Sequence, residues 1–381
     1  MEIPDAKLIA ELLDYAVGVR RALHARPELS GQEYGTSEFI RRELEGMGYT
    51  VRGIRTGLVT EARGQEGGTI ALRADTDALP VTEKTGLPFA ATCGRMHACG
   101  HDGHTAMLLA AAKLFTLRTP ERNVRLIFQY GEEGEGGAEK MIAGGCLDGV
   151  SEIYAFHLCP ELEKGTFATN SSCLFAGVME FDVRLTGKSS HCAAPDEGAD
   201  ALAAAARFVI ESKAALGGEN TLMHTGKLVA GSARNIVAGE AALECSFRYR
   251  EKSALTAAKE RLGELLSDIR ERTGVSGAMT VRAVYPPLVN DARCVAKMRA
   301  LTGAGHMDGR FTAEDFAFYA EKVPACMCWL GVRDETHTSP LHSDTFDFDE
   351  SVMKEGIRAF AMLDLLGQTV NSANYANGVW H

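Results

Sequence analysis

One short stretch of the sequence, residues 71–105, gathers side chains that commonly bind metal ions. Cys99 and His101 lie two residues apart within it, so in an extended loop both side chains point the same way. Zinc accepts both thiolate and imidazole ligands, and this spacing therefore predicts a C-x-H clip for a borderline divalent metal. The candidate metal ligands in the stretch are Asp75, Asp77, His97, Cys99, His101 and His104.

Each of these residues has a commoner explanation when it is considered alone. A single buried cysteine usually serves packing, and a single histidine is usually a hydrogen-bonded core or surface residue. Their accumulation in one glycine-containing loop, between an expected strand and an expected helix, favours a metal site. A thiolate nucleophile at Cys99, with His97 or His101 as its base, is the second interpretation.

A second chemical segment, GEEGEGGAEKM at residues 131–141, follows a run of β-branched and aromatic residues. Neighbouring side chains on a strand face opposite ways, so Glu132 and Glu133 can serve one site only from a loop, which the flanking glycines predict. One carboxylate could then bind metal while the other accepts a proton from water. A solvated charge pair is the commoner role of Glu-Glu, and the position after a strand is what favours a catalytic role.

The elements expected around these residues would bring them to one edge of a sheet. Strands predicted over 69–73, 123–130 and 151–157 end beside the aspartates, beside the glutamates and at His157. In open α/β sheets the carboxyl ends of the strands form the site. His342, ahead of a helix predicted over 352–366, offers one more imidazole.

Length and composition predict a two-domain protein of ordinary globular type. The chain has 381 residues, more than one core usually supports, with 45% hydrophobic and 24% charged residues. Its formal net charge of −11, without a basic stripe, argues against nucleic acid or an anionic membrane as a partner. The first thirty residues show no signal peptide, and the ten scattered cysteines indicate reduced thiols, so the expected location is cytoplasmic.

The middle of the sequence changes pattern and predicts a separate domain. From about residue 177 to 285 the expected order is βαββαβ, which is the order of a ferredoxin-like sheet with helices on one face. His191 lies in the loop after the first strand of this region, and Asn235 lies between its two middle strands. From position alone, solvent exposure is the favoured explanation for both residues.

Motifs along nearly the whole chain resemble those of aminoacylase and carboxypeptidase-type dinuclear metallohydrolases. The resemblance is strongest to the amidohydrolase branch that includes hippurate hydrolase, indole-acetyl-amino-acid hydrolases and N-acetyl-diaminopimelate deacetylase. As a set the motifs are highly specific, although none is so alone. They are LHARPELSGQE, LRADTDALP, MHACGHDGHTAMLL, GEEGEGGAEKMI, FHLCP, GKSSHCAAP, GSARNIVAG, YPPLVN, TAEDFAFY and LHSDTFDFDE.

The resemblance implies an α/β catalytic domain of the zinc-exopeptidase type, interrupted by a ferredoxin-like lid or dimerisation domain. The expected boundaries are 1–175 and 287–381 for the catalytic domain and 176–286 for the lid. Two divalent metals, zinc or manganese with cobalt or nickel also suitable, would be held by five ligands. The resemblance assigns that role to Cys99, His101, Glu133, His157 and His342.

The same resemblance implies roles for four other residues and a reaction. Glu132 would be the general base, and Asp77 would orient a ligand imidazole. His191 matches a lid histidine that can act in the same or a partner subunit, which makes it our candidate for stabilising the oxyanion, and Asn235 would contact the substrate. The expected activity is hydrolysis of N-acyl-amino acids by a homodimer or higher homo-oligomer. The alternatives are a dipeptidase or carboxypeptidase, a hydrolase dependent on Cys99, and a non-catalytic metal-binding protein.

Overall fold

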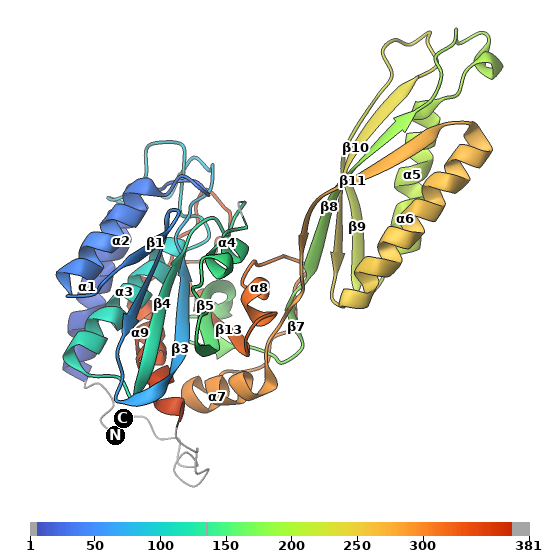
Figure 1. The fold of residues 1–381 in the computed structure, drawn as a ribbon. Coiled ribbons are helices and arrows are strands. Elements are labelled where there is room, and N and C mark those ends of the chain that lie inside the picture. Colours follow the sequence, from blue (N-terminus) through green and yellow to red (C-terminus); the bar gives the residue numbers. More distant parts are fainter. Residues whose placement is uncertain (1–5, 135, 368–381) are drawn as a thin grey trace. The chain divides into compact units, whose positions relative to one another are not determined.

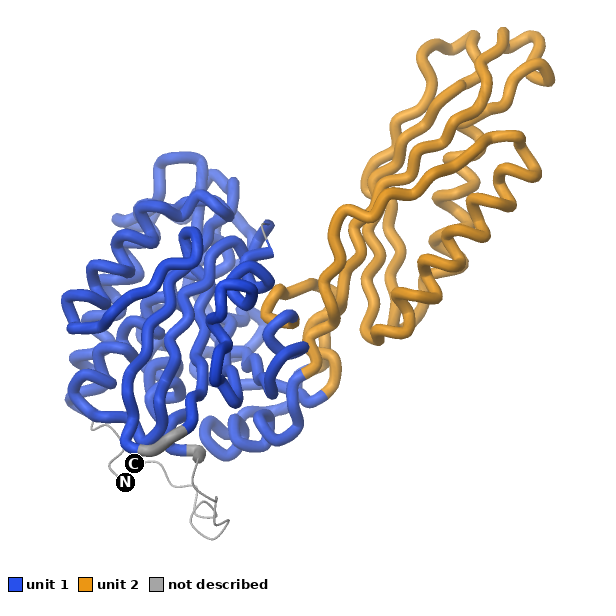
Figure 2. The backbone as a smooth tube through the Cα atoms, in the orientation of Figure 1, with its two compact units in different colours: residues 1–171, 290–307, 318–381 blue, residues 172–289, 308–317 orange. Residues whose placement is uncertain are grey.

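The computed structural model describes residues 6–134 and 136–367, and within it the chain forms two compact units. Unit 1 consists of residues 1–171, 290–307 and 318–381, and unit 2 of residues 172–289 and 308–317 (Figure 2). The short segment 308–317, which was expected in the catalytic domain, therefore groups with unit 2. None of the helices in the described ranges combines the length and the apolar character needed to cross a membrane.

Unit 1 is built on a seven-stranded mixed sheet (Figure 1). Strands β4, β3, β5 and β13 run parallel in its centre, and antiparallel strands flank them on both sides. This arrangement confirms the predicted α/β class. In spatial order the strands are β1 (Arg52–Ile54), β2 (Gly57–Ala62), β4 (Arg122–Gln129), β3 (Glu66–Asp75), β5 (Val150–Glu163), β13 (Ala325–Arg333) and β6 (Phe167–Ala168).

Helices cover the sheet of unit 1, and α1, α3 and α9 pack against one another. Helix α3 is buried along most of its length, because it lies between its neighbouring helices and the sheet. The helices are α1 (Ala6–His24), α2 (Tyr34–Gly46), α3 (His101–Leu117), α4 (Gly137–Ala143), α7 (Ala292–Thr302), α8 (Ala317–Ala320) and α9 (Met353–Leu363), with 3-10 turns η2 (Glu350–Val352) and η3 (Asp364–Gly367).

The central strand β3 shows how the sequence separates core from site. Ile70, Leu72 and Ala74 alternate along the strand and enter the main hydrophobic core. On the opposite face lie Arg73 and Asp75, both buried, whose side chains form an ion pair of 2.7 Å. Because buried charges require partners, this pairing marks the carboxyl end of β3 as a polar site inside an apolar domain.

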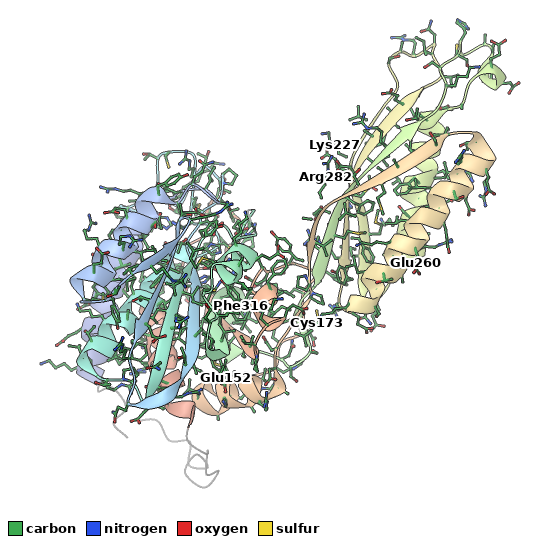
Figure 3. All side chains as sticks on the ribbon, in the orientation of Figure 1. Glu152, Cys173, Lys227, Glu260, Arg282 and Phe316 are labelled. Atoms are coloured by element: carbon green, nitrogen blue, oxygen red, sulfur yellow. The ribbon has the colours of Figure 1, made fainter. Side chains whose placement is uncertain are left out.

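Unit 2 contains a four-stranded antiparallel sheet in the order β11-β8-β10-β9, which is the ferredoxin-like order. Alternate residues of the sheet pack against the helices, while Lys227 and Arg282 extend from the other side and Glu260 lies on α6 (Figure 3). A small ladder pairs β7 with β12. The elements are β7 (Cys173–Phe175), β8 (Gly177–Thr186), η1 (Pro195–Glu197), α5 (Ala201–Leu216), β9 (Thr221–Ala230), β10 (Glu240–Tyr249), α6 (Lys252–Thr273), β11 (Ser276–Tyr285) and β12 (Leu288–Val289).

One element is longer than its sequence pattern predicts. Strand β5 was expected to end at His157, but it continues to Glu163. Its pairing with β3 ends at Ala155, whereas its pairing with β13 continues beyond His157. His157 therefore lies where β5 has passed the end of β3, and its side chain still reaches the site.

Candidate metal centre

Five segments of unit 1 meet where β3 and β4 end. Asp75 is the last residue of β3, Cys99 lies in the loop before α3, and His101 is the first residue of that helix. The loop turns at Gly100, where glycine is required because φ is 83° and because a Cβ would lie 2.9 Å from the Leu158 Cδ1 atom. The remaining segments are the loop after β4, strand β5 and the loop before η2.

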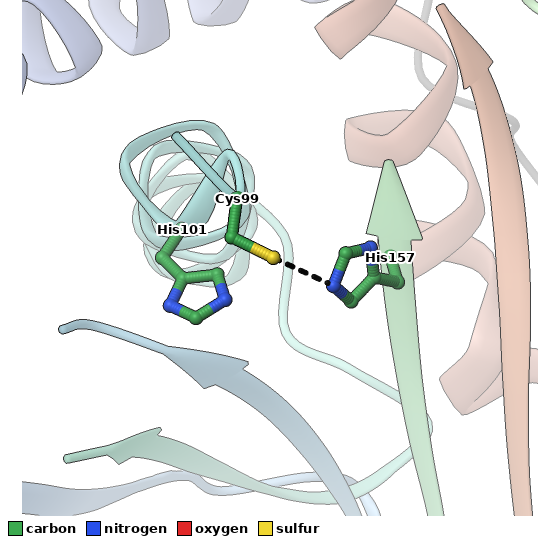
Figure 4. A group of neighbouring side chains, drawn as sticks. All are labelled: Cys99, His101 and His157. Carbon is green, nitrogen blue, oxygen red and sulfur yellow. Dashed lines mark hydrogen bonds between the residues drawn. The ribbon is translucent and has the colours of Figure 1, made fainter. Parts of the chain in front are cut away.

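The five side chains expected to bind metal come together in this region. Donor atoms of Cys99, His101 and His157 lie within 4.8 Å of one another, and so do those of Cys99, Glu133 and His342. A third group of the same size joins His101 to Glu133 and Glu132. Figure 4 shows Cys99 and His157 facing each other, with a distance of 3.5 Å from Sγ to Nε2, and His101 beside them. The three groups share members and form one cluster.

Hydrogen bonds fix the tautomers of two of these histidines. His101 Nδ1 lies 2.9 Å from the carbonyl oxygen of Asp77 and 3.2 Å from its Oδ1, so Nδ1 carries the proton. His157 Nδ1 likewise donates to the carbonyl oxygen of Leu158 at 2.8 Å. In both rings Nε2 is left with its lone pair directed into the cluster, as a metal ligand requires. His101 Nε2 is buried and makes no hydrogen bond among the described residues.

The donor set fits divalent cations. Burial opposes charge on His101, but Asp75, Asp77 and Glu133 outweigh it and raise the pKa of the imidazole to about 10. The same carboxylates would favour a metal cation at Nε2 in place of the proton. One thiolate, three imidazoles and a carboxylate suit zinc and related ions.

The environment of Cys99 disfavours the thiolate-nucleophile hypothesis. Burial raises the pKa of the Cys99 thiol well above its usual value, and Glu133, Glu132 and Asp75 raise it further. A cysteine nucleophile needs the opposite, a pKa lowered by positive surroundings. Only a cation beside Sγ would make this thiol a thiolate, and that is the chemistry of a metal ligand.

Two histidines of the first stretch differ from the expected ligands: His104 lies beside His101 but has no nitrogen free to bind metal, and His97 lies outside the cluster. His104 Nδ1 donates to Asp75 at 2.6 Å, and its Nε2 accepts from the Leu158 amide at 3.0 Å, so neither nitrogen has a lone pair available. His97 is buried beside His24, with ring centroids 6.4 Å apart, and neither of its nitrogens is hydrogen-bonded within the described ranges. The sequence could not distinguish His97 and His104 from the expected ligand His101, because all three histidines have similar local surroundings in the sequence.

His342 has an unusual backbone conformation. Its φ is 65°, in the left-handed region that non-glycine residues seldom adopt, and its amide donates to the Ala98 carbonyl at 2.8 Å. Its Nε2 lies 3.2 Å from Glu133 Oε1. Such strain costs about 1 kcal/mol or more and is typical of functional sites, where the surroundings hold it in place.

His191 and Asn235 lie in unit 2, on two adjoining loops. A β-bridge joins His191 to Ile236, and the Cys192 amide donates to the Asn235 carbonyl at 3.0 Å. Both side chains are exposed. The Ala193 amide donates to His191 Nδ1 at 3.1 Å, so in the neutral ring the proton is on Nε2.

Several buried or partly buried polar residues that support the site were not identified from the sequence. Ser30 donates to Asp77 Oδ2 at 2.5 Å, and the Gly131 amide donates to Glu33 at 2.9 Å. Arg20 and His24 on α1 both contact Asp102, next to His101. Acidic and basic residues spaced this way in a sequence usually lie on a solvated surface, and only the tertiary structure shows that these are buried.

Comparison with known proteins agrees with the motifs. A Bacillus subtilis protein named N-acetylcysteine deacetylase is 34% identical over 367 residues, which cover 92% of this chain and 96% of that protein. A Bacillus subtilis crystal structure described as a dinuclear metal binding peptidase from the M20 family superposes with a TM-score of 0.84 at 32% identity, covering 95% of this chain and 98% of that one.

A longer protein also matches. A Rhodococcus jostii relative with the name of a glutamate–cysteine ligase is 37% identical over 369 residues, and the match covers 91% of this chain but only 46% of that protein.

Residues 71–363 match the profile of peptidase family M20/M25/M40. With a match of this extent and relatives similar over their full length, the chain belongs to peptidase family M20/M25/M40 and is a hydrolase.

Proposed function

We propose that this protein is a metal-dependent amidohydrolase that cleaves N-acyl-amino acids to a carboxylic acid and an amino acid. The observation that carries the proposal is the position of Glu132, whose carboxylate lies within 4.8 Å of donor atoms of His101 and Glu133. A purely structural metal site has no use for a further carboxylate beside its ligands. The relative named N-acetylcysteine deacetylase supports an acylated amino acid as the substrate class.

Cys99, His101, Glu133, His157 and His342 would hold two divalent ions, zinc or manganese, with cobalt or nickel as further candidates. When bound, these ions would polarise the scissile carbonyl and make a water molecule acidic near neutral pH. The dinuclear description of the similar Bacillus subtilis structure supports a pair of ions. Asp77 would keep His101 in the tautomer that presents Nε2.

The side chains of this protein would then handle the protons. Glu132 would accept the proton of the attacking water and return it to the leaving amine, as a general base and acid. His191, with its proton on Nε2, would donate a hydrogen bond to the oxyanion, a contribution of about 3 kcal/mol for one donor. Asn235 would bind the amide or carboxylate group of the substrate.

The substitution Glu132→Gln tests the base. It removes the proton acceptor while keeping the shape of the side chain, so turnover should fall by about 10²- to 10⁴-fold while the protein still binds two metals. Glu139→Gln is the matched control, because Glu139 lies exposed on the next helix, α4. Normal turnover in Glu132→Gln would end the assignment.

A second candidate function, a dipeptidase or carboxypeptidase on short peptides, is favoured by the description of the Bacillus subtilis structure as a peptidase. A substrate panel of N-acetyl-amino acids, N-benzoyl-amino acids and dipeptides separates the two candidates. Preference for acyl-amino acids supports the first function, and preference for free peptides supports the second. Bound metal without hydrolysis of any member would favour a non-catalytic protein.

We further propose that the protein forms a homodimer through unit 2. Strand β9 is an edge strand, and Leu222, Leu228 and Val229 on it are exposed. An exposed apolar edge is suited to pairing with another chain. Val229→Lys should therefore shift the sedimentation coefficient to that of a monomer, and an active wild-type monomer would refute the dimer.

We also propose that the protein acts in the cytoplasm. All ten cysteines are free thiols, which supports a reducing compartment.

A further inference from the structure

Residues 28–33, which follow α1, form hydrogen bonds with two loops that carry site residues: the loop after β3 and the loop after β4. The Ala78 amide donates to the Glu28 carbonyl at 2.8 Å, and Ser30 Oγ donates to Asp77 at 2.5 Å. Three residues later, Glu33 reaches the other loop through the Gly131 amide at 2.9 Å. Residues 28–33 are thus connected to the loop after β3 and to the loop that carries Glu132.

Glu33 is a buried carboxylate that accepts three hydrogen bonds. The residue is 1% exposed, and its Oε1 accepts from the amides of Gly31 and Gly131, each at 2.9 Å. Its Oε2 accepts from the Thr56 hydroxyl at 2.8 Å. Burial of a carboxylate is costly unless hydrogen bonds of this kind stabilise it.

The backbone on either side of Glu132 is fixed by these contacts. The Gly131 amide is bound by Glu33, and the Gly131 carbonyl accepts from the Gly137 amide at 3.2 Å. On the far side, the Glu133 amide donates to Asp77 Oδ2 at 2.9 Å. The turn is closely packed, because a Cβ on Gly137 would lie 1.6 Å from the Tyr130 carbonyl oxygen. The direction in which Glu132 leaves the backbone therefore depends on where the Gly131 amide is held.

We infer that Glu33 is a positioning residue for the base Glu132 and the adjacent ligand Glu133, acting through its hydrogen bond to the Gly131 amide. This role rests on the proposed function for its catalytic consequence. It does not depend on the charge of Glu33, because backbone amides need only an acceptor oxygen at the correct distance.

Two single substitutions separate the length of the side chain from its charge. Glu33→Gln keeps the length, and its Oε1 can still accept from both amides while its NH₂ group donates to Thr56. Glu33→Asp keeps the carboxyl group but shortens the side chain, so its oxygens cannot reach the Gly131 amide from the same backbone position. Displacement of a catalytic group by about 1 Å can reduce the rate about 10²-fold.

We expect kcat of Glu33→Asp to fall by about 10- to 100-fold with KM changed less than about threefold, and kcat of Glu33→Gln to stay within about threefold of wild type. Thr56→Val is the matched control, since it removes the third hydrogen bond of the same carboxylate without touching Gly131. It should lower thermal stability but leave kcat near wild type. The inference would be overturned if Glu33→Asp had the same kcat as Glu33→Gln. It would also be overturned if Thr56→Val lost as much kcat as Glu33→Asp.

A second readout does not need a substrate. Titration of the metal-free variants with Mn²⁺ or Zn²⁺ in a calorimeter should show weaker binding for Glu33→Asp than for Glu33→Gln, because Glu133 lies on the same turn. If the wild type hydrolyses no acyl-amino acid, the proposed function fails, and this titration still decides the role of Glu33. Equal metal affinity in the two variants, together with equal kcat where activity is measurable, would contradict it.

Discussion

Replacing Asp77 by Asn should weaken metal binding without disrupting the fold. Asp77 is buried, and its Oδ2 accepts from Ser30 Oγ at 2.5 Å and from the Glu133 amide at 2.9 Å. The single amide oxygen of Asn can keep both of these donors. Its NH₂ group must then face His101 Nδ1, which lies 3.2 Å from Oδ1 in the native site and is itself a donor. The substitution therefore removes one charge-assisted hydrogen bond and creates one unfavourable contact.

The size of the effect follows from that one interaction. A hydrogen bond to a charged group contributes about 1.5–3 kcal/mol. At about 1.4 kcal/mol for each tenfold change, metal affinity should fall by about 10- to 100-fold. The Asp77 carbonyl oxygen, 2.9 Å from the same nitrogen, keeps the ring in place and limits the loss.

Competition against a chromophoric chelator would measure this affinity. Ser30→Ala is the control, because it removes one donor from Asp77 and leaves the carboxylate facing His101; we expect a change below about threefold. If Asp77→Asn binds metal as tightly as wild type, or if Ser30→Ala loses as much affinity as Asp77→Asn, then Asp77 does not act through His101.

Three further perturbations have defined outcomes. Arg20→Met should lower the free energy of unfolding by about 3–5 kcal/mol in urea denaturation, because it removes one of the buried partners of Asp102. Arg21→Gln, at an arginine side chain that is 52% exposed, should cost less than about 1 kcal/mol, and similar losses in the two variants would contradict the buried network. Gly137→Ala should reduce turnover at least about tenfold, because its Cβ meets a carbonyl oxygen, while Gly18→Ala in α1, with open space around it, should keep turnover and slightly raise thermal stability. Metal added back to the metal-free protein at about 100 times Kd should raise the free energy of unfolding by about 2.7 kcal/mol per site, and a melting temperature independent of metal concentration would argue against a folded-state metal site.

Most elements and their order along the chain were predictable from the sequence because their signals are local. The alternation of Met179, Phe181 and Val183 predicts a strand with one buried face, and these residues do enter the core of unit 2. The Cys99 and His101 pair was also predictable, since an i, i+2 spacing directs both side chains to one side. His97 has the same spacing from Cys99, yet it faces His24 on α1.

The supporting residues were not predictable, since their roles depend on contacts between distant segments. Ser30 and Glu33 lie 47 and 98 positions from the residues that they contact, Asp77 and Gly131. In the sequence, Glu33 is one polar residue among several in a turn-rich segment. Its burial results from the packing of residues 28–33 against the loops after β3 and β4, and sequence periodicity does not indicate that packing.

The most direct test of the central claim is hydrolysis of an N-acyl-amino-acid panel before and after dialysis against a chelator, with Mn²⁺, Zn²⁺ or Co²⁺ added back. A metal-dependent amidohydrolase loses activity with its metal and recovers it when the ion returns. Activity that persists after the metal content has fallen to zero, and that is blocked by alkylation, would contradict the claim and assign the chemistry to Cys99.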